Sequence, residues 1–131
     1  MHGPIIYKGI RFRIVFASLK SGERPGERFF DALSMSDKAK LISLFRLAGD
    51  LGELRNPEKF GDLGNGLYEF KSHQIRMPFQ YSRRERGVIV ITHGFVKKKD
   101  KTPPEEIARA RRYFEEDQAD GGLTIAGSSK Q

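Results

Sequence analysis

Hydrophobic and polar positions alternate between residues 10 and 16 of this 131-residue chain. The apolar positions on one side of the alternation are Ile10, Phe12, Ile14 and Phe16. A period of two is typical of a strand with one buried face, so we expect a strand over 10–16. The next segment, Leu19–Arg28, contains two glycines and Pro25. It is expected to be a loop that leads into a short helix over residues 25–32.

The segment from Ser34 to Gly49 has a helical period instead. Its apolar stripe consists of Leu41, Ile42, Leu44, Phe45 and Ala48. Ser34 and Asp37 have the spacing of a capping box, with Asp in the place of the usual Glu, which marks the start of a helix. We expect Gly49 and Gly52 to end this helix. The glycine- and proline-containing segment 56–65 is expected to be a connector.

Three strand-like segments follow in quick succession, separated by short polar breaks. They are Leu67–Lys71, Ile75–Ser82 and Gly87–Phe95. Such short breaks predict an antiparallel meander. The third segment contains four consecutive apolar residues, 88–91, which indicates a central strand that is covered on both faces.

The second of these strands is expected to have one apolar and one polar face. Ile75, Met77, Phe79 and Tyr81 share the first face, and Arg76, Pro78 and Gln80 share the second. Pro78 has no N–H to donate to a neighbouring strand. This strand is therefore expected to be an edge strand or to be bulged at Pro78.

The start of the last helix is indicated by Thr102-Pro103-Pro104-Glu105, in which Thr102 is the expected N-cap and Glu105 completes a capping box. Gly121-Gly122 is the expected end. We therefore predict an α+β fold in one domain, residues 1–118, followed by a flexible tail, 119–131. The sheet is expected to be mainly antiparallel and twisted, with two helices near the N-terminus and one near the C-terminus.

The net charge of +7 is concentrated in one part of the sequence. Between Lys71 and Lys101 there are nine Lys or Arg residues and two acidic residues, Glu85 and Asp100, so the remainder of the chain is neutral. A localised basic region on a neutral protein is typical of a site for a polyanion such as a nucleic acid. The alternative is a solvated surface that serves solubility.

Composition excludes several other classes of site. The absence of Cys excludes disulfides, thiolate zinc sites and cysteine nucleophiles. No metal-ligand cluster or phosphate-binding glycine motif is present, so we expect neither metal nor cofactor. We expect no signal peptide and no membrane association, because Lys8, Arg11 and Arg13 interrupt the apolar N-terminal run, and we expect a cytoplasmic location.

Two sequence elements resemble a known protein family. The first is GLYEFK at 66–71 followed by IRM at 75–77, and the second is HGFVKKKDKTP at 93–103 followed by Glu106, Ile107 and Ala110. Together they resemble the phage-derived Gp49-like and HigB-type toxins of the RelE/ParE superfamily. The resemblance extends over residues 54–114, and the N-terminal half matches only in its order of a strand and then helices.

This resemblance implies a small RelE-like fold, with helices packed on one side of the sheet and a basic groove on the other. It implies a toxin of a type II toxin–antitoxin pair that cleaves mRNA in a ribosome-dependent way, without a metal. The expected partners are mRNA, the ribosome and a cognate antitoxin of helix-turn-helix type. Two alternatives remain, a non-catalytic phage-derived nucleic-acid-binding protein and a ParE-like gyrase inhibitor, because fold alone does not determine function.

Metal-free RNA cleavage needs a base near the 2′-OH, cations around the phosphate and an acid at the leaving 5′-oxygen. The family Arg corresponds to Arg76, whose guanidinium can hold a phosphate through two hydrogen bonds. Lys97, Lys98 and His93 are the other candidate catalytic residues, and the sequence does not decide which of them transfers protons. The tyrosine that some RelE toxins carry early in the last helix is absent.

Further residues are candidates for binding RNA through charge or by stacking on bases. They are Lys71, His73, Lys99, Lys101, Arg83, Arg84, Tyr68 and Tyr81. His73 is also a candidate for proton transfer. Lys71 stands where many relatives have Arg. Glu69 matches the family acid, and we expect it to hold Arg76 or Lys71 in place across the hairpin.

Overall fold

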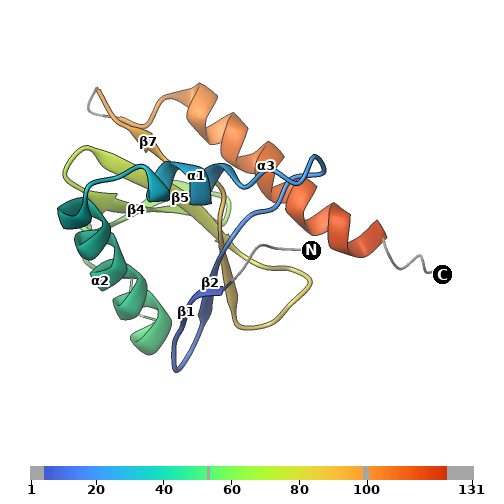
Figure 1. The fold of residues 1–131 in the computed structure, drawn as a ribbon, viewed down its shortest axis with the longest axis horizontal. Helices are drawn as coiled ribbons and strands as arrows, with labels where there is room; N and C mark the ends of the chain where they lie inside the picture. Colours follow the sequence, from blue (N-terminus) through green and yellow to red (C-terminus); the bar gives the residue numbers. More distant parts are fainter. Residues whose placement is uncertain (1–4, 53, 99–100, 124–131) are drawn as a thin grey trace.

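The computed structural model describes residues 5–52, 54–98 and 101–123, and over this part of the chain the fold is α+β, as predicted (Figure 1). One mixed sheet of seven strands is combined with three helices. The elements in chain order are β1 (Ile5–Lys8), β2 (Arg13–Phe16), α1 (Pro25–Asp31), α2 (Met35–Leu51), β3 (Phe60–Gly64), β4 (Leu67–Ser72), β5 (Ile75–Tyr81), β6 (Val88–Ile91), β7 (Phe95–Val96) and α3 (Pro104–Leu123).

The strands lie in the order β1-β2-β6-β5-β4-β3, and β7 pairs with β5 beyond the end of β6. The β4–β5–β6 meander is antiparallel, as predicted. The N-terminal β2 joins it by parallel pairing with β6, in a register that places Ile14 opposite Ile89. The two halves of the chain therefore form a single sheet.

Helices cover both faces of this sheet, which corrects the expectation that they pack on one side. Helices α1 and α2 cover the face that carries Ile89 and Ile91, whereas Phe114 of α3 packs on the opposite face with Val88 and Val90. The reason lies in β6, where all four residues are buried. A strand that is apolar on both faces needs cover on both, so the prediction that residues 88–91 form a doubly covered strand is confirmed.

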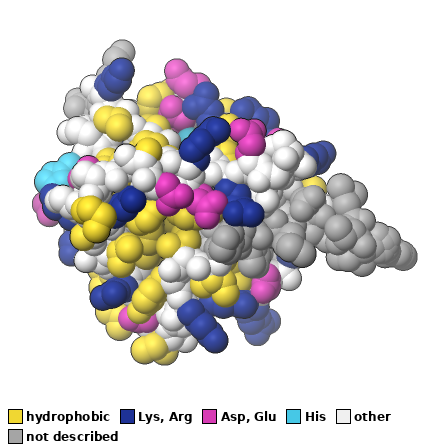
Figure 2. Space-filling model, viewed as in Figure 1, with side chains coloured by type: hydrophobic (Ala, Val, Ile, Leu, Met, Phe, Trp, Pro, Cys, Tyr) yellow, Lys and Arg dark blue, Asp and Glu magenta, His cyan; other side chains and the backbone are white. Residues whose placement is uncertain are grey.

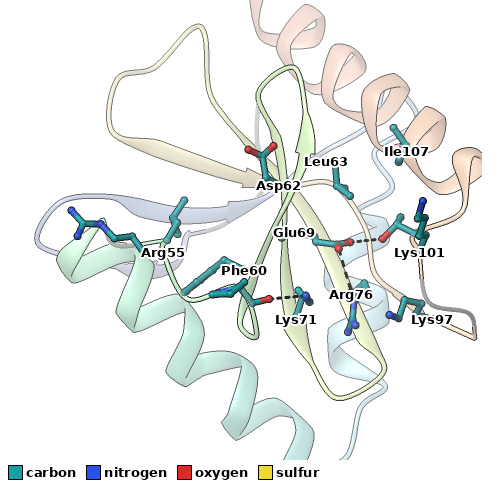
Figure 3. Close-up of a pocket in the computed structure, with 14 residues that line it drawn as sticks. Arg55, Phe60, Asp62, Leu63, Glu69, Lys71, Arg76, Lys97, Lys101 and Ile107 are labelled. Carbon is teal, nitrogen blue, oxygen red and sulfur yellow. Dashed lines mark hydrogen bonds and ion pairs between the residues drawn. The ribbon is translucent and has the colours of Figure 1, made fainter.

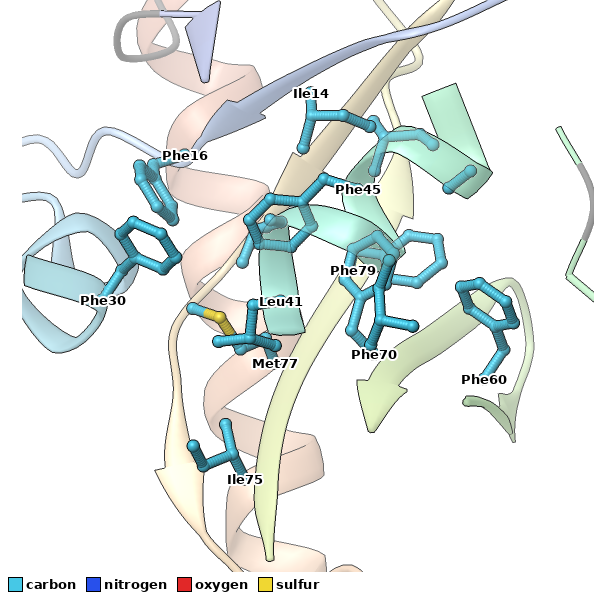
Figure 4. Close-up of a cluster of buried hydrophobic side chains, with 14 residues drawn as sticks. Ile14, Phe16, Phe30, Leu41, Phe45, Phe60, Phe70, Ile75, Met77 and Phe79 are labelled. Atoms are coloured by element: carbon cyan, nitrogen blue, oxygen red, sulfur yellow. The ribbon is translucent and has the colours of Figure 1, made fainter. Parts of the chain in front are cut away.

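Aromatic rings fill the core between α2 and the sheet (Figure 4). Phe70 of β4 lies at the centre of this group, with ring centroids 4.3 Å from Phe79, 5.0 Å from Phe45 and 5.8 Å from Phe60. Leu41 and Phe45, both from the predicted apolar stripe, are fully buried on α2. The expected start of this helix is also confirmed, since the Ser34 side chain accepts a hydrogen bond from the backbone N–H of Asp37.

The N-terminal region differs from the prediction of a single strand over 10–16. The chain forms a hairpin of β1 and β2, and Ile10 in the turn is 87% exposed. The turn is held by the carbonyl of Gly49, which accepts hydrogen bonds from the backbone N–H groups of Arg11 and Phe12. Gly49 therefore does not end α2. The helix continues to Leu51, and Gly52 caps it with φ of 65°.

The contact between this turn and α2 requires glycine at position 9. A Cβ added to Gly9 would collide with the backbone carbonyl group of Gly49, which cannot move aside as a flexible side chain can. We expect Gly9→Ala to lower the free energy of unfolding by roughly 1–3 kcal/mol, as overpacking does in other proteins. Urea denaturation of the variant and the wild type measures this. A variant as stable as the wild type would show that the turn moves away from α2 without cost.

The predicted connector 56–65 contains a strand that the sequence analysis did not predict. β3 pairs with β4 as the outer strand of the sheet, with Gly61 opposite Glu69. Its five residues include two glycines and a charged Asp62, so the pattern of turn residues obscured it. Pairing with β4, rather than its own composition, makes this segment a strand.

Pro78 interrupts one side of β5, which lies inside the sheet and not at its edge. The pairing with β6 reaches Phe79, and the pairing with β7 begins at Arg76. Between these two pairings, the segment that joins β6 to β7 has one residue more than β5 does. The N–H of Thr92 in this segment donates to the Pro78 carbonyl. The expected edge position of this strand is therefore wrong, and the additional residue lies in the segment between β6 and β7 rather than in β5.

The last helix begins one residue later than Thr102 as N-cap would place it. α3 starts at Pro104, and the Thr102 hydroxyl donates to the Glu69 carboxylate at 2.9 Å rather than capping the helix. The helix continues through the two glycines that were expected to end it, as far as Leu123. The rest of the predicted tail, 124–131, lies outside the described residues.

Candidate functional site

A groove of about 630 Å³ lies on the α3 side of β3, β4 and β5, beside the start of α3 (Figure 3). Five basic residues line it: Arg55, Lys71, Arg76, Lys97 and Lys101. Two acidic residues, Asp62 and Glu69, line it as well. The groove therefore has an excess of positive charge.

Arg76 lies in the floor of the groove on β5, on the face opposite Ile75 and Met77, as its position in the strand predicted. It is only 5% exposed. Its Nη1 donates to the carbonyl oxygens of His73 at 2.6 Å and Ile75 at 2.9 Å. Burial lowers the pKa of Arg76, and the charge of Glu69 opposes that shift. The guanidinium is thus fixed by the backbone at one nitrogen.

Glu69 of β4 lies beside Arg76 and is equally buried. Its Oε2 is 3.9 Å from Nε of Arg76, an ion pair too long to be a hydrogen bond, and Nε is a buried nitrogen with no hydrogen-bond partner. Its Oε1 accepts the Thr102 hydroxyl. The expected pairing of Glu69 with Arg76 is confirmed. A Cβ at position 61 would lie 2.8 Å from Oε2 of Glu69, so a larger residue there would require the Glu69 side chain to shift.

Lysine side chains form the walls of the groove. Lys71 pairs with Arg76 in the β4–β5 register, and its Nζ donates to the Pro57 carbonyl at 2.7 Å. Lys97 follows β7, where its backbone N–H donates to the carbonyl of Gln74 in the β4–β5 turn. Lys101, which precedes α3, also lines the groove. Lys71, Arg76, Lys97 and Lys101 were all predicted from sequence, and the fold brings them to one groove.

Other predicted basic residues lie elsewhere. Lys98 lines a separate hollow between β7 and the start of α3. Lys99 lies outside the described residues. Arg83 forms a two-bond ion pair with Glu115 of α3, and the backbone N–H of Arg84 donates to Gln118 of the same helix. Figure 2 shows Lys and Arg side chains scattered over the visible face rather than gathered in one patch.

His93 is buried behind the groove and does not line it. Its Nε2 lies 2.9 Å from Oε1 of Glu106, and its Nδ1 lies 3.1 Å from the Thr92 hydroxyl. The ring stacks on Phe95 and meets the edge of Tyr113. His93 thus connects the sheet to α3 and, with both nitrogens engaged, lies outside the groove in which a catalytic role was predicted for it.

The environment of His93 has a consequence for stability. Burial lowers its pKa from the ordinary 6.5, although Glu106 opposes the shift. Below pH 6.5 the unfolded chain therefore binds a proton that the folded chain excludes. We expect the free energy of unfolding to fall as the pH is lowered from 6.5, by at most about 1.4 kcal/mol per pH unit from this residue. Urea denaturation at pH 7.5, 6.5 and 5.5 should show a weaker decline in His93→Gln than in the wild type, and parallel declines would contradict the assignment.

His73 lies in the exposed β4–β5 turn with φ of 54°. Its Nε2 is 3.1 Å from Nζ of Lys40, over a shallow hollow on the α2 side. The side chain does not line the groove, whereas its carbonyl oxygen holds Arg76. His73 therefore contributes to the site through its backbone, which the sequence analysis did not predict.

Tyr68 and Tyr81, the predicted stacking residues, lie on the wrong face for the groove. Both pack against the aromatic core under α2, where Tyr68 stacks on Phe79 and Tyr81 contacts Phe12. Burial is the main reason for a raised pKa of Tyr81. Strand alternation places Tyr68 on the same face as Phe70, so the sequence alone already indicated that Tyr68 faces the core and not the groove.

Arg55 and Thr102 line the groove and were not predicted as site residues. Arg55 comes from the connector before β3, where the sequence carries no motif. Thr102 was interpreted only as a helix cap. No cluster of His, Asp or Glu that could hold a metal ion occurs among the described residues. Within the same part of the chain, no helix combines the length and apolar character needed to cross a membrane.

The groove-forming part of the chain matches a known family. A model of the phage-derived Gp49-like proteins (DUF891) matches residues 28–115, from α1 into α3, and leaves the β1–β2 hairpin outside. No curated protein matches the chain. The match includes every described residue named above as lining the groove, and it agrees with the resemblance carried by residues 66–110. The chain therefore belongs to the phage-derived Gp49-like family, in the RelE/HigB-type toxin branch.

Proposed function

We propose that this protein is the toxin of a type II toxin–antitoxin pair and that it cleaves mRNA on the ribosome without a metal. The observation that carries the proposal is the groove, in which a buried, backbone-held Arg76 is surrounded by Lys71, Lys97 and Lys101. Membership of the Gp49-like family supports the toxin class. An mRNA target on translating ribosomes implies a cytoplasmic site of action.

The proposed role of Arg76 is to stabilise the phosphate during reaction. Two backbone carbonyls hold Nη1 and so fix the orientation of the guanidinium. The guanidinium therefore needs little reorganisation to donate to a phosphate that accumulates negative charge. Lys71 lies opposite Arg76 in the sheet and supplies a second positive charge on the other side of the same phosphate.

We assign proton transfer to a carboxylate and a lysine side chain of the groove. The 2′-oxygen attacks phosphorus as its proton passes to the Glu69 carboxylate. The P–O5′ bond then breaks, and the leaving oxygen takes a proton from the Lys97 ammonium. The products are a 2′,3′-cyclic phosphate and a 5′-hydroxyl end. His93 has no part in this scheme because it is buried outside the groove.

Expression of the protein alone, with mapping of mRNA ends, tests the proposal. We expect growth arrest and new 5′-hydroxyl ends within translated messages, and the purified protein should cut mRNA only when ribosomes are added. Intact mRNA with a DNA-damage response would instead indicate a gyrase inhibitor. Salt-dependent RNA binding without cleavage, on ribosomes or off them, would indicate a non-catalytic nucleic-acid-binding protein.

The proposed partner is an antitoxin of helix-turn-helix type encoded next to this gene. Co-expression with that neighbour should restore growth, and the two proteins should purify together. If the neighbour neither restores growth nor binds, the toxin–antitoxin part of the proposal is wrong, whereas cleavage itself is tested separately by the mRNA ends.

A further inference from the structure

The hollow between β7 and the start of α3 lies directly beside the groove and has no role in the scheme above. It has a volume of about 570 Å³, and its lining includes Phe95, Val96, Lys98, Pro103, Pro104 and Glu105. We propose that it binds a nucleobase of the RNA strand whose phosphate lies in the groove. This inference rests on the proposed action on RNA and names a subsite for that substrate.

The two cavities share a wall. Lys101 and Thr102 line both of them. Thr102 is fixed by its hydrogen bond to Glu69, which in turn lies beside Arg76. A strand that crosses this wall places a phosphate against Arg76 on one side and an adjoining base over the hollow on the other.

The surface of the hollow suits a flat ring that stacks on apolar side chains and is flanked by the negatively charged phosphates of the same ligand. Val96 is 54% exposed, so this hydrophobic side chain offers an apolar surface to a ligand in the hollow. Phe95 is half-buried and stacks on His93, with ring centroids 5.6 Å apart. Since His93 is itself held by Glu106 and Thr92, Phe95 has a fixed support. Bases stack on such surfaces with little sequence preference.

The charged residues of the hollow are placed for the rest of a nucleotide. Lys98 and Lys101 supply positive charge that complements the phosphates flanking the base. Glu106 is engaged by His93 and Arg109, so Glu105 is the carboxylate that faces a ligand with its acceptor oxygens. Carboxylates accept hydrogen bonds from the N–H groups on base edges. An RNA base matches this combination better than an apolar peptide segment does.

The test measures RNA binding with two single-stranded probes of equal length. One carries bases and the other is abasic, and both carry 2′-O-methyl groups so that neither can be cleaved. We expect Val96→Ser to weaken binding of the base-carrying probe about tenfold and to leave the abasic probe unchanged. Val96→Trp should strengthen binding of the base-carrying probe alone. Met35→Ser removes another exposed hydrophobic side chain, at the start of α2, and should change neither.

Equal effects of Val96→Ser on both probes, or no effect on either, would overturn the subsite. If Val96→Ser unfolds, the gain expected for Val96→Trp still decides the question. Weakened binding of the antitoxin with unchanged RNA binding would assign the hollow to a protein partner and overturn the inference. Failure of the proposed function looks different. The folded wild-type protein, and the position-96 variants with it, would then leave mRNA intact on ribosomes.

Discussion

Replacing Arg76 by alanine is expected to reduce mRNA cleavage roughly 100- to 1000-fold, the usual effect of removing one preorganised donor to a developing negative charge. Arg76→Lys should recover only part of this loss. A lysine keeps the charge but cannot hold two phosphate oxygens with a planar group, and it cannot reach the carbonyls of His73 and Ile75 in the same way. The rate of cleavage on programmed ribosomes, measured for purified variants, gives the comparison.

Two controls separate loss of chemistry from loss of fold. Arg28→Ala removes the same charge from an exposed site on α1, where Arg28 is 3.4 Å from Glu23, and should cleave like the wild type. Arg76→Ala also leaves Glu69 without its ion pair, so its thermal unfolding must be measured beside its activity. A folded Arg76→Ala protein that cleaves at the wild-type rate would exclude Arg76 from the reaction.

The largest effect on stability is expected from Phe70→Ala, with a loss of about 3–5 kcal/mol in the free energy of unfolding. Phe70 is fully buried and touches three other aromatic rings, those of Phe45, Phe60 and Phe79. Removing it leaves a cavity that these rigid rings cannot fill by rearrangement. Chemical denaturation of the purified variant measures the loss.

Met35→Ala is the matched control for that experiment, because Met35 is 81% exposed at the start of α2. Its stability should stay within about 0.5 kcal/mol of the wild type. A loss of less than about 1 kcal/mol in Phe70→Ala would mean that the aromatic group repacks, in conflict with the usual cost of such a cavity.

Most of the elements could be predicted from sequence where one period dominated a segment. α2 was found by its apolar stripe and its Ser34 cap, and β6 by its apolar run. β1 and β3 were missed because neither segment has a clear pattern of its own. β1 is a strand because it pairs with β2, and β3 is a strand because it pairs with β4. Such pairing between neighbouring strands cannot be predicted from local composition.

The site could be predicted where a side chain's position follows from strand alternation, and could not where it depends on tertiary packing. Alternation put Arg76 opposite the apolar face of β5, and the groove indeed contains it. The position of His93 outside the groove could not be predicted from its strand, because its contacts with Glu106 and Tyr113 depend on how α3 packs on the sheet. Lys97 and Lys98 are neighbours in sequence, yet the end of β7 directs them to different cavities.

The parallel pairing of β2 with β6 bears on how this chain emerges during translation. β2 ends at Phe16 and β6 at Ile91, so the N-terminal hairpin has no β6 to pair with until residue 91 has been added. Contacts between such distant segments form late and slowly. Lys97 and Lys101 are made later still. A nascent chain therefore lacks a complete groove until Lys101 has been added and β6 has paired with β2.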